Sequence, residues 1–292
     1  MKFGIIPNVS KKEMPDVLLK LIKKIRLYGN EFLVDKAIKN IFDAKTLKKF
    51  NGKLFDIKKL VQLSDIIVSI GGDGTMLNTA YATYKYGKPI VGLNIGKLGF
   101  LAEFDIDNVD ELFNSILKNE YEVEERIALS GKISNKSFPE LFAVNDIVVD
   151  KGPYPKMIKL RIEIDDNYVT TFTADGLILA TPTGSTGYSL STGGPVVSPK
   201  ADVITISPIS PHTLTMRHLV ISVEQKIKIS VESNIPRVQI NCDGQRVIPI
   251  NVPNSILIEK SKKKIKLIHI RNNNYFEILR TKLMWGIDLR NH

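Results

Sequence analysis

Residues 65–75 read DIIVSIGGDGT, a short apolar run that leads directly into a glycine-rich turn. Residues 66–70, IIVSI, are typical of a β-strand that is covered on both faces. The turn is GGDG at 71–74, and residues 76–86 then have helical composition and end at Gly87. Glycines let the backbone come close to a ligand, and the free N–H groups of a helix start favour an anion. The stretch therefore predicts a phosphate-binding site.

Asp73 is unexpected in such a turn, because a carboxylate repels phosphate. It makes sense if it has a task of its own, either to accept a proton from an attacking hydroxyl or to help hold the magnesium of a nucleotide. The alternative is that Asp73 or Thr75 only caps the helix. The turn is not a P-loop, because no Gly-Lys-Ser/Thr follows. It is a poor dinucleotide fingerprint, since Leu77 stands where the third glycine should be.

Length and composition are those of an ordinary soluble globular protein. The chain has 292 residues, 43% of them hydrophobic and 25% charged, which allows two domains with cores of their own. No stretch approaches the roughly 20 apolar residues that span a membrane, and residues 1–12 do not resemble a signal peptide. The single cysteine, Cys242, excludes an internal disulfide and a thiolate metal cluster. We therefore expect a cytoplasmic protein with no membrane partner and no metal site built by the chain itself.

The net charge of +10 suits anionic small substrates and also nucleic acid. Aromatic residues are not interleaved with the basic clusters, as a single-strand binder would require. We therefore expect no nucleic-acid partner. A basic nucleic-acid-binding module stays an alternative, which a steep salt dependence of DNA binding would reveal.

The first part of the chain alternates between strands and helices. Residues 2–7, 31–34 and 89–93 read as strands, residues 14–28 as an amphipathic helix, and 96–101 as a second glycine turn. This alternation predicts an α/β domain over residues 1–105, with a Rossmann-like parallel sheet and ligands at the carboxyl ends of its strands.

The pattern changes after a connecting helix at 107–119. Short alternating runs from 121 to 270 predict an all-β domain, a stacked-sheet sandwich, over residues 106–270. Residues 274–285 return to a helical pattern. The C-terminal segment, 271–292, is therefore expected to pack back on the N-terminal domain.

A second motif stands in the β-rich half. Residues 175–191 read DGLILATPTGSTGYSLS, in which a strand enters a loop of hydroxyl residues and glycine. Such a loop suits phosphates and ribose hydroxyls, although alone it is more often an ordinary turn.

The two motifs together strongly resemble those of the NAD kinase family. The GGDGT signature is shared with diacylglycerol and sphingosine kinases and, more loosely, with phosphofructokinases, whereas the hydroxyl loop selects NAD kinase. Asp146 stands where the family often has Glu, and Gly187 where it often has Ala. Further matches are Asn145-Asp146, Gly96–Leu101, Ser207-Pro208, Pro211-His212-Thr213-Leu214, Asp243-Gly244-Gln245, and Phe276–Arg280 with Lys282-Leu283 and Trp285.

The resemblance implies transfer of the γ-phosphoryl group of ATP to the 2′-hydroxyl of the adenosine ribose of NAD, giving NADP. It implies Mg²⁺ or another divalent cation with ATP, and a homodimer or homotetramer formed through the β-rich domain. We hypothesise that Asp73 is the general base. Gly71, Gly72, Gly74 and Thr75 would bind phosphate or ATP. The NAD site would comprise Asp73, Gly74, Asn145, Asp146, Lys156, Asp175, Thr186, Gly187, Tyr188, Ser189, Leu190, Ser191 and Gln245.

The implied roles within that site differ. Asn145 and Asp146 would bind adenine or ribose, and Asp175 would lie near the nicotinamide side. Tyr188 could stack on a ring or belong to the core. Asp175-Gly176 and Asp243-Gly244 could equally be structural hairpin turns.

Two other functions stay open. One is a kinase of the same superfamily that acts on a lipid or sugar hydroxyl, although the sequence shows no amphipathic membrane-facing stretch. The other is a non-catalytic nucleotide sensor, which an intact Asp73 argues against.

Overall fold

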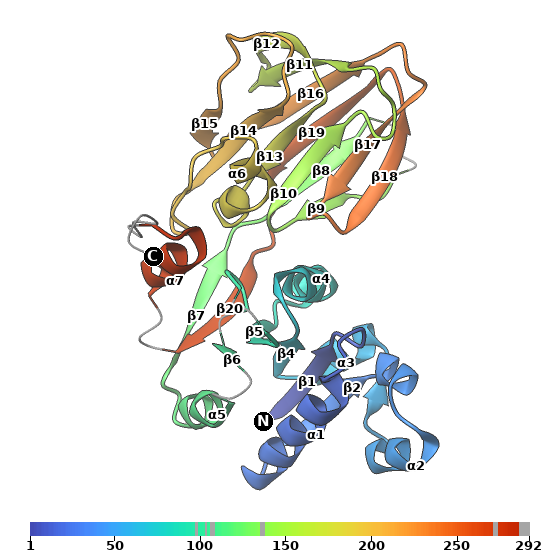
Figure 1. Ribbon diagram of the computed structural model, residues 1–292, viewed down its shortest axis with the longest axis vertical. Coiled ribbons are helices and arrows are strands. Elements are labelled where there is room, and N and C mark those ends of the chain that lie inside the picture. Colours follow the sequence, from blue (N-terminus) through green and yellow to red (C-terminus); the bar gives the residue numbers. More distant parts are fainter. Residues whose placement is uncertain (97–98, 103, 106–108, 135–137, 271–273, 286–292) are drawn as a thin grey trace, which may run out of the picture. The chain divides into compact units, whose positions relative to one another are not determined.

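The computed structural model describes residues 1–96, 99–102, 104–105, 109–134, 138–270 and 274–285. The chain forms two compact units (Figure 1): unit 1, Met1–Glu124 with Lys266–His292, and unit 2, Glu125–Ile265. The sequence predicted boundaries at residues 105 and 270. The units divide the chain elsewhere because β7 (Tyr121–Arg126) and β20 (Ile265–Ile270) pair at one edge of the unit 1 sheet.

Unit 1 is built on a largely parallel sheet with the strand order β3-β2-β1-β4-β5-β20-β7, and β6 pairs with β5 beside this path. The pairs among β1 to β5, and those of β5 with β6 and β20, are parallel. The predicted Rossmann-like sheet is thus confirmed. The remaining strands are β1 (Lys2–Pro7), β2 (Glu31–Asp35), β3 (Leu54–Phe55), β4 (Ile66–Ile70), β5 (Pro89–Asn94) and β6 (Phe104–Asp105).

The helices of unit 1 follow the apolar periodicity where the sequence has one. Helix α1 (Met14–Leu27) buries the predicted face that includes Val17, Leu21 and Ile25. Helix α7 (Tyr275–Leu283) belongs to unit 1, as predicted for the C-terminal segment; residues 271–273 and 286–292 of that segment lie outside the described residues. The others are α2 (Ala44–Leu47), α3 (Ile57–Leu63), α4 (Asp73–Thr83), α5 (Val109–Leu117), and the 3-10 helices η1 (Lys36–Asn40), η2 (Lys48–Phe50) and η3 (Tyr84–Tyr86).

The strand order places the GGDG turn at a topological switch point. Strand β1 has β2 on one side and β4 on the other, so connections leave the sheet in opposite directions there. Pro7 at the end of β1 pairs with Ile70 at the end of β4, and the N–H of Asn8 donates to the carbonyl of Ile70 at 2.8 Å. Ligands of open α/β sheets bind at this position, outside the carboxyl ends of the strands.

Unit 2 contains two six-stranded antiparallel sheets, as predicted. Their orders are β15-β14-β13-β10-β17-β18 and β12-β11-β16-β19-β8-β9. One apolar core draws side chains from both sheets, among them Ile147 and Val149 of β10 and Ile229 of β16. The strands are β8 (Leu129–Ile133), β9 (Leu141–Ala143), β10 (Asp146–Asp150), β11 (Ile158–Ile164), β12 (Asn167–Ala174), β13 (Gly176–Ala180), β14 (Val203–Ile209), β15 (Leu219–Ser222), β16 (Ile227–Glu232), β17 (Arg237–Cys242), β18 (Arg246–Asn251) and β19 (Asn254–Lys260).

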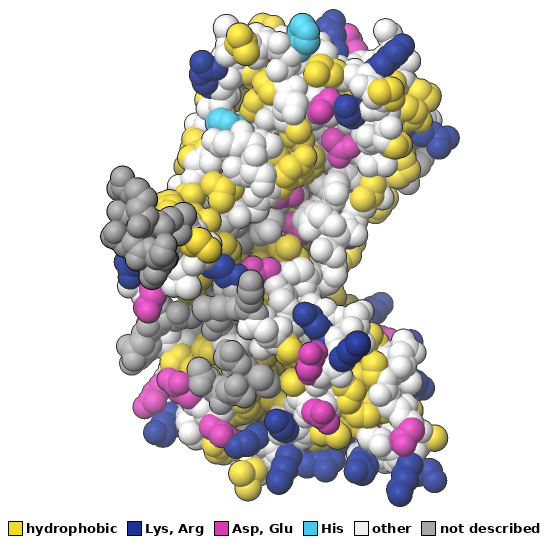
Figure 2. All heavy atoms as spheres, viewed as in Figure 1, with side chains coloured by type: hydrophobic (Ala, Val, Ile, Leu, Met, Phe, Trp, Pro, Cys, Tyr) yellow, Lys and Arg dark blue, Asp and Glu magenta, His cyan; other side chains and the backbone are white. Residues whose placement is uncertain are grey.

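The positive charge of the chain is concentrated in unit 1. The first 60 residues contain 15 Lys or Arg residues against six Asp or Glu, so they carry nearly all of the net charge of +10. Figure 2 shows these dark blue side chains crowded at the lower end of the view, where Figure 1 has α1 and α2. Such a field attracts anionic substrates. No helix among the described residues is long and apolar enough to cross a membrane.

Candidate active site

The GGDG turn is held tightly at its start. The N–H of Gly71 donates to the carbonyl of Leu93 on β5 at 2.8 Å, which ties the turn to the sheet. A Cβ at Gly71 would lie 2.3 Å from the Thr75 hydroxyl, so a larger residue does not fit. That hydroxyl accepts from the Asn8 amide at 3.3 Å. Gly71 thus allows β4 to pass directly into α4.

The turn is open where a ligand would approach. A Cβ built on Gly72 meets nothing within 4 Å, and Gly74 is exposed. Helix α4 begins at Asp73, and its first backbone bonds run from Thr75 and Met76 to the carbonyl of Gly72. The earliest N–H groups of a helix have no intrahelical partner and carry the positive end of its dipole. This opening therefore suits an anionic group such as phosphate.

Asp73 does not cap its helix. The N-cap residue of α4 is Gly72, and no side chain caps it. The half-buried Asp73 carboxylate instead accepts three backbone N–H groups of the second glycine turn. Oδ2 accepts from Phe100 at 2.9 Å, and Oδ1 accepts from Leu101 at 3.0 Å and Ala102 at 3.2 Å. The two glycine turns predicted from sequence are therefore joined through Asp73; Lys97 and Leu98 of the second lie outside the described residues.

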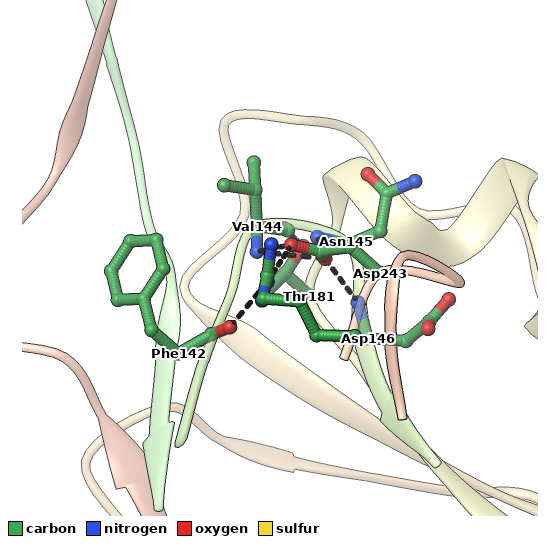
Figure 3. A network of polar contacts seen from close by, with 7 residues as sticks. Phe142, Val144, Asn145, Asp146, Thr181 and Asp243 are labelled. Atoms are coloured by element: carbon green, nitrogen blue, oxygen red, sulfur yellow. Dashed lines mark hydrogen bonds and ion pairs between the residues drawn. The ribbon is translucent and has the colours of Figure 1, made fainter. Parts of the chain in front are cut away.

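The Asn145–Asp146 pair of unit 2 is fixed by Asp243 (Figure 3). The buried Asp243 carboxylate accepts the N–H groups of Val144 at 2.9 Å, Asn145 at 2.7 Å and Asp146 at 3.3 Å. Arg246 Nη2 completes the network, at 3.0 Å from Asp243 and 2.8 Å from the carbonyl of Phe142. We call this network the Asp243 clamp. It holds the backbone of residues 144–146 and leaves the side chains of Asn145 and Asp146 pointing away from it in Figure 3.

Both of those side chains have an unusual environment. Asn145 Oδ1 is buried and has no hydrogen-bond partner within the described residues. Asp146 is 5% exposed. Its burial and, second, the negative charge of Asp243 raise the pKa of Asp146 to about 7. A buried polar atom without a partner is costly, so Asn145 Oδ1 is suited to accept a hydrogen bond from a ligand.

The hydroxyl loop packs directly on this pair. Thr181 Oγ1 donates to the carbonyl of Val144 at 2.6 Å, and the N–H of Gly184 donates to Thr181 Oγ1 at 3.2 Å. A Cβ at Gly184 would lie 2.1 Å from the carbonyl oxygen of Asn145, so only glycine allows this approach. The loop contains η5 (Thr183–Thr186) and α6 (Tyr188–Ser191).

Several hydroxyls expected to face a ligand are used within the protein. Ser189 Oγ shares a 2.9 Å hydrogen bond with Ser207, and Thr186 Oγ1 donates to the carbonyl of Thr183 at 3.4 Å. Ser185, which was not predicted as a site residue, likewise donates to the carbonyl of Pro182 at 2.7 Å. Gly187, Tyr188, Leu190 and Ser191 are partly or fully open, and the Tyr188 ring is 48% exposed. Tyr188 is thus a surface aromatic residue and not part of the core.

Gly187 is the residue of the hydroxyl loop that lies beside the side chains of Asn145 and Asp146. A Cβ on Gly187 would lie 3.7 Å from Asn145 Nδ2 and 3.8 Å from Asp146 Oδ2. Gln245 lies in the turn between β17 and β18 beside Asp243, and its N–H donates to the carbonyl of Cys242 at 3.1 Å. Asn145, Asp146, Gly187 and Gln245 thus belong to one end of the β10–β13–β17 sheet.

Lys156 and Asp175 lie at the other end of that sheet. Asp146 pairs with Ala180, whereas Asp150 pairs with Gly176, the residue after Asp175. Four residues of strand span about 13 Å. Asp175 forms a 2.7 Å ion pair with Lys151, and Lys156 is exposed in the loop after β10. Within one chain, unit 2 therefore does not bring Asp175 or Lys156 together with the Asn145–Asp146 pair.

The described residues do not form a metal cage. Among them, no three His, Cys, Asp or Glu side chains cluster so as to hold an ion. Sequence reasoning also missed two features: the Asp243 clamp, and the N–H groups of Phe100, Leu101 and Ala102. Almost every residue type has a backbone N–H group, so the sequence does not show which of them bind a carboxylate. Asp243 was interpreted only as part of a turn motif. Its neighbour Arg246 gave no signal at all.

Two protein-family models match most of the chain. Residues 3–121 match the model of the ATP-NAD kinase N-terminal domain, and residues 144–270 match that of the ATP-NAD kinase C-terminal domain. The NAD kinase of Prosthecochloris aestuarii is 37% identical over 287 residues, which cover 98% of each chain. That of Caldanaerobacter subterraneus subsp. tengcongensis is 37% identical over 285 residues, covering 97% of this chain and 98% of the relative.

Two solved structures are similar along almost the whole chain. Yeast NADH kinase, crystallised with NADH, has a TM-score of 0.86 at 26% identity and is matched over 100% of this chain and 90% of its own. An NAD kinase from Archaeoglobus fulgidus, in complex with ATP, has a TM-score of 0.77 at 27% identity over 97% and 99%. Both domain models, the relatives and the two structures lead to the same conclusion: the chain belongs to the NAD kinase family of enzymes.

Proposed function

We propose that the chain transfers the γ-phosphoryl group of ATP to the 2′-hydroxyl of the adenosine ribose of NAD. The observation that carries the proposal is the Asp73 carboxylate, which is held by three backbone N–H groups within an open phosphate-binding turn. Phosphoryl transfer needs alignment, neutralisation of phosphate charge and an acceptor for the hydroxyl proton. The turn and Asp73 can supply all three.

The step balances with the groups present. The 2′-hydroxyl gives its proton to the Asp73 carboxylate while its oxygen forms a bond to the γ-phosphorus. The bond between that phosphorus and the β–γ bridging oxygen breaks, and its electron pair leaves with ADP. Gly72, Gly74 and the first N–H groups of α4 would stabilise the phosphate oxygens. Gly71, whose N–H is bonded to Leu93, would shape the turn. Thr75, whose hydroxyl contacts Asn8, would keep the turn in shape.

Mg²⁺ enters this reaction with ATP, as part of the substrate. The described residues offer no three-ligand cage, and Mg²⁺ is commonly bound through substrate phosphates, water and one or two carboxylates. When bound, the ion neutralises phosphate charge. The chain's own contribution is to orient the nucleotide and accept the proton.

We assign recognition of the dinucleotide to unit 2. Buried Asn145 Oδ1 can accept a hydrogen bond from an adenine amine or a ribose hydroxyl, and Asp146 can exchange one with a ribose hydroxyl. Exposed Tyr188 can stack on a ring, and Gly187, Leu190, Ser191 and Gln245 would line the approach. The hydroxyls of Thr186 and Ser189 would act through the shape of the loop, because both are bonded within the protein.

Lys156 and Asp175 are the weakest members of the predicted NAD site. Asp175 lies opposite Lys151, six residues along the ladder from Asn145, which corresponds to about 20 Å. Lys156 follows in the loop after β10. We propose that the chain assembles as a homodimer or homotetramer through unit 2, as the family resemblance implies. Edge strands β12 and β15 expose Tyr168, Val169 and Val220, and paired edges would cover them. Light scattering of the purified chain measures the mass of the assembly, and a monomer at micromolar concentration contradicts this proposal.

A cytoplasmic location fits the single buried thiol, Cys242.

The test is a coupled assay with the full chain. Purified protein is mixed with NAD, ATP and MgCl₂, and NADP is read with a dehydrogenase that does not accept NAD. We expect NADP from the native chain and a loss of about 100- to 10,000-fold in kcat for Asp73→Asn, because removing a general base typically costs this much. NAD binding, followed by calorimetry, should persist in that variant.

Asp110→Asn is the matched control. Asp110 is exposed, pairs only with Lys24 among the contacts described, and should keep native turnover. Substantial turnover by Asp73→Asn would overturn the role of the base. A folded native chain that binds ATP and gives no NADP would favour another hydroxyl acceptor, such as the lipid or sugar of the related kinases.

A further inference from the structure

The residues that hold Asp73 form a small closed turn. The N–H of Gly99 donates to the carbonyl of Ala102 at 3.1 Å, so residues 99–102 fold back on themselves and their inner N–H groups converge. The turn lies directly on β5, since a Cβ at Gly92 would be 2.8 Å from the Ala102 Cα and 3.1 Å from the carbonyl oxygen of Leu101. Successive N–H groups of this kind make a concave site for an anion, and here the anion is Asp73.

The three donors divide unequally between the two carboxylate oxygens. Oδ1 accepts from both Leu101 and Ala102, whereas Oδ2 accepts only from Phe100. A carboxylate oxygen has about two acceptor sites. Both sites of Oδ1 are therefore in use, and Oδ2 keeps one site for a further hydrogen.

Gly99 makes this arrangement possible. A Cβ at Gly99 would lie 1.9 Å from Asp73 Oδ1 and 3.1 Å from Oδ2. The nearest atom is the end of an aspartate side chain and not backbone, so an added methyl group would displace the carboxylate rather than the fold. The side chain of Asp73 thus fits its place only because residue 99 has none.

Resting on the proposed function, we propose that the turn Gly99–Ala102 is the positioning element for the base, and that Oδ2 of Asp73 is the atom that accepts the 2′-hydroxyl proton. Gly99 is a positioning residue that acts through Asp73. The donors of Leu101 and Ala102 fix Oδ1, and this sets the direction of the free acceptor site on Oδ2. Proton transfer needs this direction, because donor and acceptor must lie within hydrogen-bond reach in the reacting complex.

The first test is Gly99→Ala in the full chain. We expect kcat to fall about 10- to 100-fold, because a shift near 1 Å in a catalytic group costs up to about this much. The Michaelis constants for NAD and ATP should stay within about threefold, because only the contact of Asp73 with the 2′-hydroxyl is displaced and the other proposed substrate contacts are unchanged. Amide hydrogen exchange of residues 100–102 should become faster, since their acceptor has moved.

A double-mutant cycle separates positioning from a general structural defect. In the Asp73→Ala background no carboxylate remains for the added methyl group at position 99 to displace, so Gly99→Ala should lower neither the residual kcat nor the melting temperature any further. Equal losses in both backgrounds would overturn the inference, because Gly99 would then act independently of Asp73. Unchanged kcat for Gly99→Ala alone would also overturn it.

Gly87→Ala is the matched control for a glycine substitution in unit 1. Gly87 has φ +62 and nothing within 4 Å of its Cβ position, so alanine there is strained but contacts nothing. It should lower the melting temperature and leave kcat unchanged. If Asp73→Asn keeps its turnover, the proposed base is wrong whatever Gly99 does. If Asp73→Asn is inactive and Gly99→Ala is fully active, only the positioning inference fails.

Discussion

Asp73 in unit 1 and Asp243 in unit 2 accept hydrogen bonds in nearly the same way. Each carboxylate takes the N–H groups of three consecutive residues, 100–102 in one case and 144–146 in the other. They differ in what else surrounds them. Asp243 has no exposed side-chain area and pairs with Arg246, whereas Asp73 is half-buried in the open GGDG turn.

This difference distinguishes a structural carboxylate from the one that we propose as the general base. Arg246 and three amides bind the Asp243 carboxylate inside the protein, so that carboxylate fixes the backbone of Asn145 and Asp146. Asp73 lacks such a cation among its described contacts and keeps one acceptor site on Oδ2. The same amide geometry thus fixes the backbone where the carboxylate is buried and paired with a cation, and in our proposal it orients a general base where the carboxylate is half-buried.

The largest effect expected from this comparison is on stability. Asp243→Ala removes the carboxylate partner of the Arg246 guanidinium and the acceptor of the Val144, Asn145 and Asp146 amides. Breaking a buried ion pair from one side costs about 3–5 kcal/mol. We expect a large loss of melting temperature and fast amide exchange over residues 141–146. Asp73→Ala is the control, and should cost less, about 1–3 kcal/mol, because it leaves amides but no cation without this carboxylate. Similar losses for the two variants would remove the distinction between them.

The second effect depends on pH and concerns Asp146, beside the clamp. Its pKa is raised to about 7, above the ordinary value of 3.8, mainly by burial. The folded chain therefore holds this proton more tightly than the unfolded chain, so stability is lost as the pH rises from about 4 to above 7. Asp146→Asn removes this loss, because asparagine does not titrate. The free energy of unfolding of this variant should exceed that of the native chain by up to about 4 kcal/mol at pH 8.5, and the difference should become smaller toward pH 5.

Urea denaturation of the ligand-free protein at several pH values measures this gain. Asp165→Asn is a control in which the pH effect has the opposite sign. The hydrogen bonds that Asp165 accepts, the strongest from the N–H of Lys226, lower the pKa of its carboxyl group. That carboxylate contributes stability above its unfolded pKa, so its loss should destabilise the chain at neutral pH. A pH-independent effect of Asp146→Asn would mean that Asp146 is not the buried acid described here.

The architecture of both units could be predicted from sequence because periodicity and turn residues report burial directly. The apolar run at 66–70, the helical face of α1 and the alternation in the β-rich half all formed the expected elements. Residues 35–63 carry no clear period, and they fold into short helices that side chains such as Asp43 and Asp56 cap.

The candidate site was predictable only in part. Asp73, Asn145 and Asp146 are recognisable because their residue types and motifs carry chemistry. The partners that orient them are backbone amides and a turn aspartate, and nothing in residue type distinguishes these from any other loop. Nor does sequence reveal that Asp175 is separated from Asn145, because the register of β10 against β13 places them at opposite ends.

The smallest effect is expected for an exposed cation that lies beside the turn Gly99–Ala102, whose N–H groups bind Asp73. Lys282 of α7 lies 5.8 Å from the ring centroid of Phe100, the residue whose amide binds Oδ2. Lys282 is exposed, unlike Arg246, and an exposed cation over an aromatic ring contributes about 0.5–1 kcal/mol. Lys282→Ala should therefore lower the melting temperature slightly and leave kcat within about twofold, because the amide of Phe100 is held by its own turn. Lys282→Arg should restore the contact. A loss of kcat as large as that of Gly99→Ala would show that α7, and not the turn on β5, sets the position of Asp73.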